Sequence, residues 1–363
     1  MAGGAQRNRG RKVAVIGAGS WGTTFAKVLC DAGCDVTVLA RRHEQAQEIQ
    51  VAKRNSQYLP GINLPKSLRA SSDPSVALRG ANLVFLAVPS QSLRQNLEDL
   101  EAHLEPNAVL VSLVKGVEKG TAMRMSEVIA DTLDIGAERI GVVSGPNIAL
   151  EIAKEQPTGA VASCIDLEVA TRIATACSAP YFRSYVNTDV VGTELGGVLK
   201  NLIALAIGIV DGVGYGENTK AAIITRGLAE MTEFAVASGA DPVTLSGLAG
   251  LGDLIATCQS PLSRNNTAGR LIGQGFSLDE TKQQMQQTAE GITSVPTVLE
   301  LAHERGIVMP IVEQVQMVLD GKMSPRNLGP HLATEDDVPK PELSLTADTS
   351  GGWRGLWRKI RGA

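Results

Sequence analysis

A single lysine lies in an almost wholly apolar stretch of this sequence. Lys200 belongs to the segment Leu-Gly-Gly-Val-Leu-Lys-Asn-Leu-Ile-Ala-Leu at 195–205, which predicts a buried helix. Burial disfavours the charged form of an ammonium and can bring its pKa toward neutrality, which suits acid–base catalysis. A lysine that extends to the surface from a core helix is an equally good interpretation. The local sequence leaves both interpretations open.

Three more residues could complete a catalytic site around such a lysine. Lys115 follows the apolar run 109–114, where its ammonium could hold a substrate and polarise its oxygen. A solvated loop lysine is the commoner outcome. Asp253 ends the sequence Gly-Leu-Gly-Asp and is expected to leave a glycine turn. Arg264 follows Ser263 at a predicted helix start, where it could clamp a phosphate, although Ser263 could equally be a simple N-cap.

The N-terminal region carries a glycine motif typical of dinucleotide binding. The β-branched run 12–16 ends at Gly17, and Gly19 and Gly22 complete the spacing G-x-G-x-x-G. Gly17 permits a tight turn, Gly19 lets a pyrophosphate approach the backbone, and Gly22 lets the next helix pack on the sheet. A helical stretch and a second strand at 35–39 follow. This context favours a bound nucleotide over a purely structural turn.

The residues after the second strand indicate which nucleotide is preferred. NAD-binding units usually place Asp or Glu there to accept from the adenosine ribose 2′-hydroxyl. This chain has Ala40, Arg41, Arg42 and His43 instead. Two guanidiniums without a neighbouring carboxylate suit a 2′-phosphate, with Arg41 as the first candidate. Arg42 could instead be a solvated residue at a helix start. The sequence therefore favours NADP(H), with NAD(H) as the alternative.

Alternating strands and helices in the first half predict an α/β fold. Further strands are expected at 83–88, 109–114, 140–144, 160–164 and 182–186, with helices such as 93–104 and 167–177 between them. This pattern predicts a Rossmann-like, doubly wound, mainly parallel sheet. Ligands should then gather at the carboxyl ends of the strands, near Gly17, Pro89, Lys115 and Gly145.

The second half changes character to long segments rich in alanine and leucine. Helices are expected at 188–210, 219–238, 264–272 and 294–305. The predicted organisation is a disordered leader, a dinucleotide-binding domain, an all-helical domain and a polar tail, at 1–11, 12–187, 188–328 and 329–363. The leader lacks the apolar core of a signal peptide.

Composition narrows the functional classes. The chain has 363 residues, 44% of them hydrophobic, which is enough for a large core and two domains. Its 34 basic and 38 acidic residues argue against a general nucleic-acid surface. The five cysteines are typical of reduced cytoplasmic thiols, and no cysteine or histidine spacing predicts a metal site. The longest apolar run, 202–210, is too short to cross a bilayer.

Seven sequence blocks resemble a known enzyme family. They are Gly-Ala-Gly-Ser-Trp-Gly at 17–22, Val-Lys-Gly at 114–116, Ser-Gly-Pro at 144–146, Glu-Leu-Gly-Gly-Val-Leu-Lys-Asn at 194–201, Gly-Leu-Gly-Asp-Leu at 250–254, Ser-Arg-Asn at 263–265 and Ala-Glu-Gly at 289–291. Together they resemble, over residues 12–325, the bacterial NAD(P)-dependent sn-glycerol-3-phosphate dehydrogenases. Seven ordered blocks are much more specific than the glycine motif alone.

The resemblance implies reversible reduction of dihydroxyacetone phosphate to sn-glycerol 3-phosphate, the precursor of glycerophospholipids, by a cytoplasmic homodimer. Lys200 would be the proton donor in reduction and the base in oxidation. The residues implied at the substrate are Lys115, Gly145, Asn147, Lys200, Asp253, Ser263, Arg264 and Asn265. Those at the nucleotide, beside the three glycines, are Ser20, Trp21, Arg41, Arg42, Tyr58, Lys115, Ala149, Arg264, Thr288 and Glu290.

Two residues depart from the family pattern. Asn147 stands where Ser or Thr is frequent, and Thr288 where an aliphatic residue is frequent, so the Thr288 contact is the weaker expectation. Two other functions compete with the dehydrogenase. A dehydrogenase of a non-phosphorylated hydroxy acid or sugar acid would not need Arg264 at a helix start. A regulator that senses NADPH without turnover would not need Lys200 and Lys115 together.

The C-terminal extension ends in a basic, apolar segment. Trp353, Leu356, Trp357 and Ile360 are spaced to form one apolar helix face among four basic residues. We expect either a weak anchor on an anionic membrane surface, docking on the protein itself, or disorder.

Overall fold

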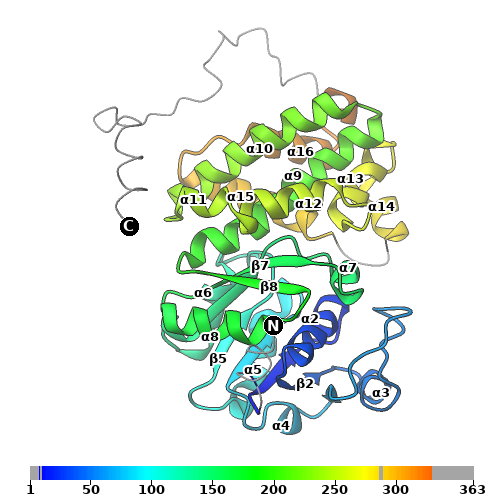
Figure 1. Cartoon of the computed structure of the whole chain (residues 1–363). Helices are drawn as coiled ribbons and strands as arrows, with labels where there is room; N and C mark the ends of the chain where they lie inside the picture. The colour runs from blue at the N-terminus through cyan, green and yellow to red at the C-terminus, as the bar shows by residue number, and fades with distance from the viewer. Residues whose placement is uncertain (1–7, 9, 286–288, 329–363) are drawn as a thin grey trace, which may run out of the picture. The chain divides into compact units, whose positions relative to one another are not determined.

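The computed structural model describes residues 8, 10–285 and 289–328, and an eight-stranded sheet organises their first half (Figure 1). The strand order is β3-β2-β1-β4-β5-β6-β7-β8. The strands are β1 Lys12–Ile16, β2 Asp35–Leu39, β3 Arg69–Ser71, β4 Leu83–Leu86, β5 Val109–Ser112, β6 Ile140–Ser144, β7 Thr158–Ser163 and β8 Phe182–Asn187. The order reverses beside β1, which makes this a doubly wound sheet with its switch point between β1 and β4.

All neighbouring strands pair in parallel except β6 and β7, which are antiparallel. Strands β4, β5 and β6 are buried along their whole length. Continuous burial fits a parallel sheet whose two faces are both covered by helices. The predicted mainly parallel, Rossmann-like fold is therefore confirmed.

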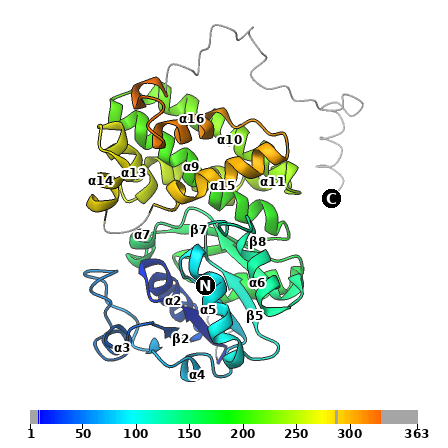
Figure 2. The ribbon, with the colours of Figure 1, turned by 180° about the vertical axis from the view of Figure 1, so that it is seen from behind.

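Helices cover the two faces of the sheet (Figures 1 and 2). The buried residues form two separate hydrophobic cores. One core contains Phe25 of α2 (Ser20–Asp31) and Ile173 of α8 (Leu167–Cys177). The other contains residues of α4 (Pro74–Ala77), α5 (Leu93–Leu100) and α6 (Met125–Leu133). The short helices α3 (His43–Gln47) and α7 (Ala149–Ala153) complete this half.

The second half of the described chain is helical. Its helices are α9 Val190–Val213, α10 Glu217–Ala237, α11 Pro242–Leu245, α12 Asp253–Gln259, α13 Arg264–Gly273, α14 Leu278–Gln284, α15 Glu290–Glu304 and α16 Pro310–Leu319. Helix α9 is the longest, at 24 residues, and α10, α12, α13, α15 and α16 all pack against it. The described residues up to 328 belong to one compact unit.

Helix α9 contains the apolar run 202–210. The whole helix is long and apolar enough to cross a bilayer, but 83% of its most apolar window is buried inside the fold. The same apolar sequence therefore makes a core helix.

Glycines let α9 and α13 approach until their backbones touch. A methyl group on Gly208 would lie 2.2 Å from the Asn266 carbonyl oxygen, and one on Gly269 would lie 2.2 Å from the Leu205 carbonyl oxygen. Both clashes involve backbone atoms, which cannot move aside cheaply. This close crossing fixes the start of α13 beside the middle of α9.

The structure differs from the prediction in three local features. The short edge strand β3 was not expected. The segment before Asp253 is a π-helical turn, Leu248–Gly252, that continues into α12, and not the open glycine turn that was predicted. Asn8, placed in the disordered leader, is buried and donates to the carbonyls of Ala32 and Thr175. The predicted tail at 329–363 lies outside the described residues.

Candidate active site

Two lysines share one carboxylate where α9, α12 and the end of β5 meet. Lys200 Nζ lies 2.7 Å from Asp253 Oδ1, and Lys115 Nζ lies 2.6 Å from Asp253 Oδ2. Lys200 also donates to Thr257 Oγ1 at 2.6 Å, and Lys115 donates to the Gly145 carbonyl oxygen at 3.0 Å. We call Lys115, Lys200 and Asp253 the lysine–aspartate cluster.

The cluster is buried and carries a net positive charge, because two ammoniums face one carboxylate. The side chain of Asp253 is 1% exposed and that of Lys200 is 8% exposed. Burial lowers the pKa of Lys200 to about 8; Asp253 opposes this shift and Lys115 adds to it. Lys200 is therefore not a surface-reaching lysine, and its pKa lies where a proton donor or acceptor works near neutral pH.

Helix packing brings Asp253 to Lys200. Asp253 is the first residue of α12, directly after the π-helical turn. A methyl group on Gly196 of α9 would lie 2.4 Å from the Ala249 carbonyl oxygen of that turn. The missing side chain at Gly196 thus lets the turn touch α9 one turn before Lys200.

The start of α13 is where the sequence predicts an anion site. Ser263 is the N-cap, and its hydroxyl accepts from the Asn266 amide at 3.3 Å, so the simple N-cap interpretation holds. Arg264 at the first helical position is exposed, and its charge opposes the desolvation that raises the pKa of the half-buried Glu290. Ser263 can cap α13 while Arg264 stays available for an anion, because only the serine side chain takes part in the cap.

Asn265 holds neighbouring elements together. Its Nδ2 donates to Asn201 Oδ1 at 2.9 Å, and its Oδ1 accepts from the Gly291 amide at 2.8 Å. These bonds join α13 to α9 and to the start of α15. A direct substrate contact by Asn265 remains a prediction, because its amide already serves this bridge.

Buried polar atoms lie near Lys115. Within the part of the chain that the structure describes, both amide atoms of Asn147 and the Ser144 hydroxyl have no hydrogen-bond partner. Asn147 follows Gly145, whose carbonyl accepts from Lys115. A buried polar group without a partner costs about 1–3 kcal/mol, so such atoms indicate a polar ligand.

The three glycines of the N-terminal motif form a cradle with space for a phosphate, and we call them the glycine cradle. Gly17 has φ +104, and a methyl group there would lie 2.6 Å from the Ala87 carbonyl oxygen. One on Gly22 would lie 2.0 Å from the Gly17 carbonyl oxygen, whereas one on Gly19 would meet no atom of the described residues within 4 Å. Gly19 is the N-cap of α2 and no side chain caps this helix start, so its first amides are not used by a capping side chain, as a pyrophosphate site requires.

Asn55 braces the cradle and was missed by the sequence analysis. Its Nδ2 donates to the Ala18 carbonyl oxygen at 2.9 Å and to Thr23 Oγ1 at 2.8 Å. Gln45 donates to the same carbonyl at 2.6 Å. Asn55 lies in a loop and Gln45 on α3, both more than 20 positions after the motif, so neither gives a local signal of such a contact.

Four more of the predicted nucleotide residues lie on or against α2, which follows the cradle: Ser20, Trp21, Tyr58 and Ala149. Ser20 donates to the Tyr58 carbonyl oxygen at 2.8 Å, and the Trp21 ring packs edge-on against Phe25. Ala149 accepts from Thr24 of α2 at 3.3 Å. Thr288 lies outside the described residues.

Arg41 and Arg42 are both exposed beyond the end of β2, but only one is engaged. Arg42 donates to Gln57 Oε1, whereas Arg41 has no partner among the described residues. Arg41 is therefore the guanidinium that is free for a 2′-phosphate.

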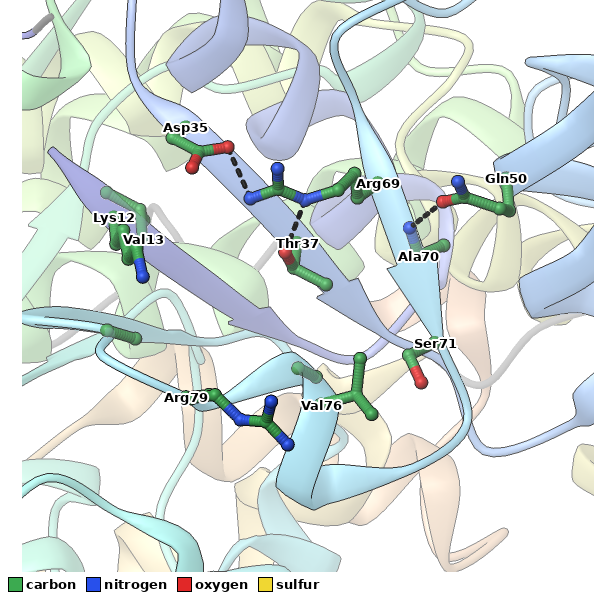
Figure 3. A pocket seen from close by; sticks show the side chains of 12 residues that line it. Lys12, Val13, Asp35, Thr37, Gln50, Arg69, Ala70, Ser71, Val76 and Arg79 are labelled. Atoms are coloured by element: carbon green, nitrogen blue, oxygen red, sulfur yellow. Dashed lines mark hydrogen bonds and ion pairs between the residues drawn. The ribbon is translucent and has the colours of Figure 1, made fainter. Parts of the chain in front are cut away.

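A hollow of about 510 Å³ lies elsewhere on the sheet, over β1, β2 and β3 beside α4 (Figure 3). Its lining includes Lys12, Asp35, Arg69 and Arg79, and Arg69 pairs with Asp35. Lys12 and Asp35 are the first residues of β1 and β2, whereas Gly17 and Arg41 follow the last residues of these parallel strands. The hollow is therefore separate from the glycine cradle.

The chain matches known protein families and individual proteins over most of its length. The family models for the NAD-dependent glycerol-3-phosphate dehydrogenase N-terminus and C-terminus match residues 12–170 and 189–329. The chain is 63% identical over 344 residues to glycerol-3-phosphate dehydrogenase [NAD(P)+] of Leifsonia xyli, covering 95% of this chain and 93% of the relative. It is 58% identical to the enzyme of that name from Streptomyces griseus, covering 86% and 94%.

A solved structure agrees with these relatives. The crystal structure of glycerol-3-phosphate dehydrogenase from Coxiella burnetii superposes with a TM-score of 0.83 at 33% identity, covering 89% of this chain and 98% of that one. Sequence and fold therefore point to the same group of proteins over almost the whole described chain.

Proposed function

The chain belongs to the NAD-dependent glycerol-3-phosphate dehydrogenase family, and we propose that Lys200 is the proton donor with which it reduces dihydroxyacetone phosphate. The reaction reversibly forms sn-glycerol 3-phosphate, the backbone precursor of glycerophospholipids. The observation that supports this role is the buried contact of Lys200 with Asp253, which faces Lys115 on its other oxygen.

Lys200 has the geometry of an acid with one proton to give. Asp253 and Thr257 accept two of its three N–H donors, which leaves the third for a carbonyl oxygen. When bound, the nicotinamide nucleotide supplies the hydride in reduction and takes it up in oxidation. Lys200 protonates the oxygen in reduction and recovers that proton in oxidation, so no full negative charge develops on the oxygen.

The neighbouring residues bind and orient the substrate. Lys115 presents its own third N–H and polarises the reacting oxygen. Asn147 supplies the unpartnered amide to the polar part of the substrate. Arg264 and the N-terminal amides of α13 hold the phosphate of the substrate. A non-phosphorylated hydroxy acid would leave these groups without a ligand.

The nucleotide site is assigned to the glycine cradle together with Arg41. The open space at Gly19 and the uncapped start of α2 fit a pyrophosphate, and the free Arg41 favours a 2′-phosphate. NADP(H) is therefore favoured and NAD(H) is the alternative.

We also propose a cytoplasmic homodimer. Five free and buried cysteines support a reducing compartment, and the family supports the dimer. The extension after residue 328 is proposed to touch anionic membranes weakly. Equal liposome binding by the full chain and by a 1–350 truncation would refute that contact.

The deciding experiment follows NADPH oxidation with dihydroxyacetone phosphate in Lys200→Ala. Turnover should be lost while NADPH binding stays intact. Lys220→Ala is the matched control, because Lys220 also lies in the helical half but pairs with Asp211 and Glu217 near the surface. Full activity in Lys200→Ala would move the acid–base role elsewhere, and no turnover in the folded wild type would favour an NADPH sensor.

A further inference from the structure

A second buried charge lies on α9, two turns before the catalytic lysine. The side chain of Glu194 is 3% exposed. Its Oε1 accepts from the Ser126 amide at 2.8 Å, and its Oε2 accepts from Arg124 Nη1 at 2.6 Å and from the Ser126 hydroxyl. The glutamate therefore holds the first turn of α6 through three donors.

Arg124 connects this contact to Lys115. Arg124 is the N-cap of α6 and pairs through its backbone with Val117 in an antiparallel bridge. Residues 117–124 thus form a closed loop that begins two residues after Lys115. A bond from α9 to Arg124 consequently restrains the loop that carries Lys115.

The stem of Lys115 crosses α9 between Glu194 and Lys200. A methyl group on Gly197 would lie 3.4 Å from both Cγ and Cδ of Lys115, and 2.8 Å from the Ser144 hydroxyl. Residues three positions apart in a helix are neighbours on its surface, about one turn apart. Glu194, Gly197 and Lys200 therefore meet, in order, the loop, the stem of Lys115 and the carboxylate of Asp253.

We propose that Glu194 and Arg124 are positioning residues, which set the register of α9 against the Lys115 loop so that both lysines reach the same carboxylate. This inference rests on the proposed function of Lys200 and Lys115. A slip of about 1 Å between the two lysines would separate one of them from Asp253, and misplacements of that size cost about a hundredfold in rate.

The test compares Glu194→Gln with Glu230→Gln. Glu230 is a matched control because it is also buried, lies on another long helix, and accepts from the Ile311 amide at the start of α16 at 2.9 Å. For each variant, kcat and KM for dihydroxyacetone phosphate, the Kd for NADPH, the melting temperature and the pH profile of kcat/KM are measured.

The inference predicts that Glu194→Gln lowers kcat about tenfold or more, with an unchanged NADPH Kd. The alkaline limb of the pH profile should move upward, because Lys115 would no longer disfavour the ammonium of Lys200 and Asp253 would pair with Lys200 alone. The other groups that act on Lys200 are Thr257, Cys258 and Glu290, and the substitution leaves them in place. Glu230→Gln should leave kcat and the limb unchanged.

The inference is overturned if Glu194→Gln keeps the wild-type kcat and limb, or if both variants lose kcat in proportion to their melting temperatures. Should Glu194→Gln fail to fold, Arg124→Lys decides, because a lysine keeps the charge but cannot bridge Glu194 and Glu127 as Arg124 does. It should show the same limb shift with a smaller loss of kcat, and wild-type values would overturn the inference. An active Lys200→Ala would instead overturn the proposed function and this inference together.

Discussion

The glycine cradle and the lysine–aspartate cluster are built from different parts of the chain. The cradle consists of backbone within six consecutive residues, and its selectivity comes from absent side chains and exposed amides. The cluster consists of side chains, and Asp253 is separated from Lys200 by 53 positions and from Lys115 by 138. Substitutions in the cradle should therefore change space and binding, whereas substitutions in the cluster should change charge and turnover.

The largest effect is expected for Asp253→Asn. Without the carboxylate the two ammoniums repel each other, and Lys200 loses the group that keeps its pKa from falling further. We expect kcat/KM to fall about a thousandfold and its alkaline limb to move to lower pH. Asp211→Asn is the control, because Asp211 pairs with Lys220 away from the cluster. A loss no larger than that of the control would contradict a cluster that depends on charge.

The second-largest effect is expected in the glycine cradle, where substitutions of Gly22 and Gly19 should differ in their effect on stability. Gly22→Ala places a methyl group 2.0 Å from the Gly17 carbonyl oxygen, so the loop must move. We expect a loss of about 1–3 kcal/mol in the free energy of unfolding, together with lost NADPH binding. A methyl group on Gly19 meets no atom of the described residues within 4 Å, so Gly19→Ala should leave stability unchanged while NADPH binding weakens. Wild-type NADPH binding in Gly19→Ala would show that Gly19 does not face the ligand.

A smaller effect is expected from Arg41→Ala, measured as the ratio of the KM values for NADPH and NADH. The KM for NADPH should rise about tenfold and that for NADH should stay unchanged, because only NADPH carries the 2′-phosphate. Arg79→Ala, in the hollow at the other end of the strands, is the control. Equal changes for the two nucleotides would remove Arg41 from cofactor selection.

The smallest effect belongs to a buried carboxyl outside both regions. Burial raises the pKa of Glu230 from its ordinary 4.5 to about 7, so the folded protein binds its proton more tightly than the unfolded chain does. The free energy of unfolding should therefore fall as pH rises from about 4.5 to about 7, by about 1–3 kcal/mol. Glu230→Gln cannot ionise at this position and therefore lacks this loss. The free energy of unfolding of the variant, measured in urea, should exceed that of the wild type by more at about pH 8 than at about pH 5. A pH-independent difference would refute the raised pKa.

The sequence predicts features built from neighbouring residues better than contacts between remote ones. The turn at Gly17 and the buried strands depend on neighbouring residues, so spacing and β-branched runs were enough to place them. Lys200 could also be identified from the sequence, because an ammonium in an apolar helix must either be buried or extend to the surface. Glu194 stands in the same helix and satisfies the same criterion, so it could have been found in that way.

The long-range contacts were not predictable from local patterns. Nothing near Thr257 indicates that it accepts from Lys200, and nothing near Asn55 indicates that it braces Ala18. These contacts exist because helix packing, as at the touching backbones of α9 and α13, sets the distances between remote side chains. The family resemblance placed Lys200 and Asp253 at one substrate site, which spacing alone did not, but their direct contact was not predicted.

The most direct test of Lys200 as the proton donor is the pH dependence of kcat/KM for dihydroxyacetone phosphate reduction in the wild type. This quantity reports the ionisation of the free enzyme, and only the protonated lysine can donate. With a Lys200 pKa of about 8, the rate should be constant at lower pH and fall about tenfold for each pH unit above it. A rate that stays constant to about pH 10 would contradict the account, because an acid with this pKa would be almost fully deprotonated there.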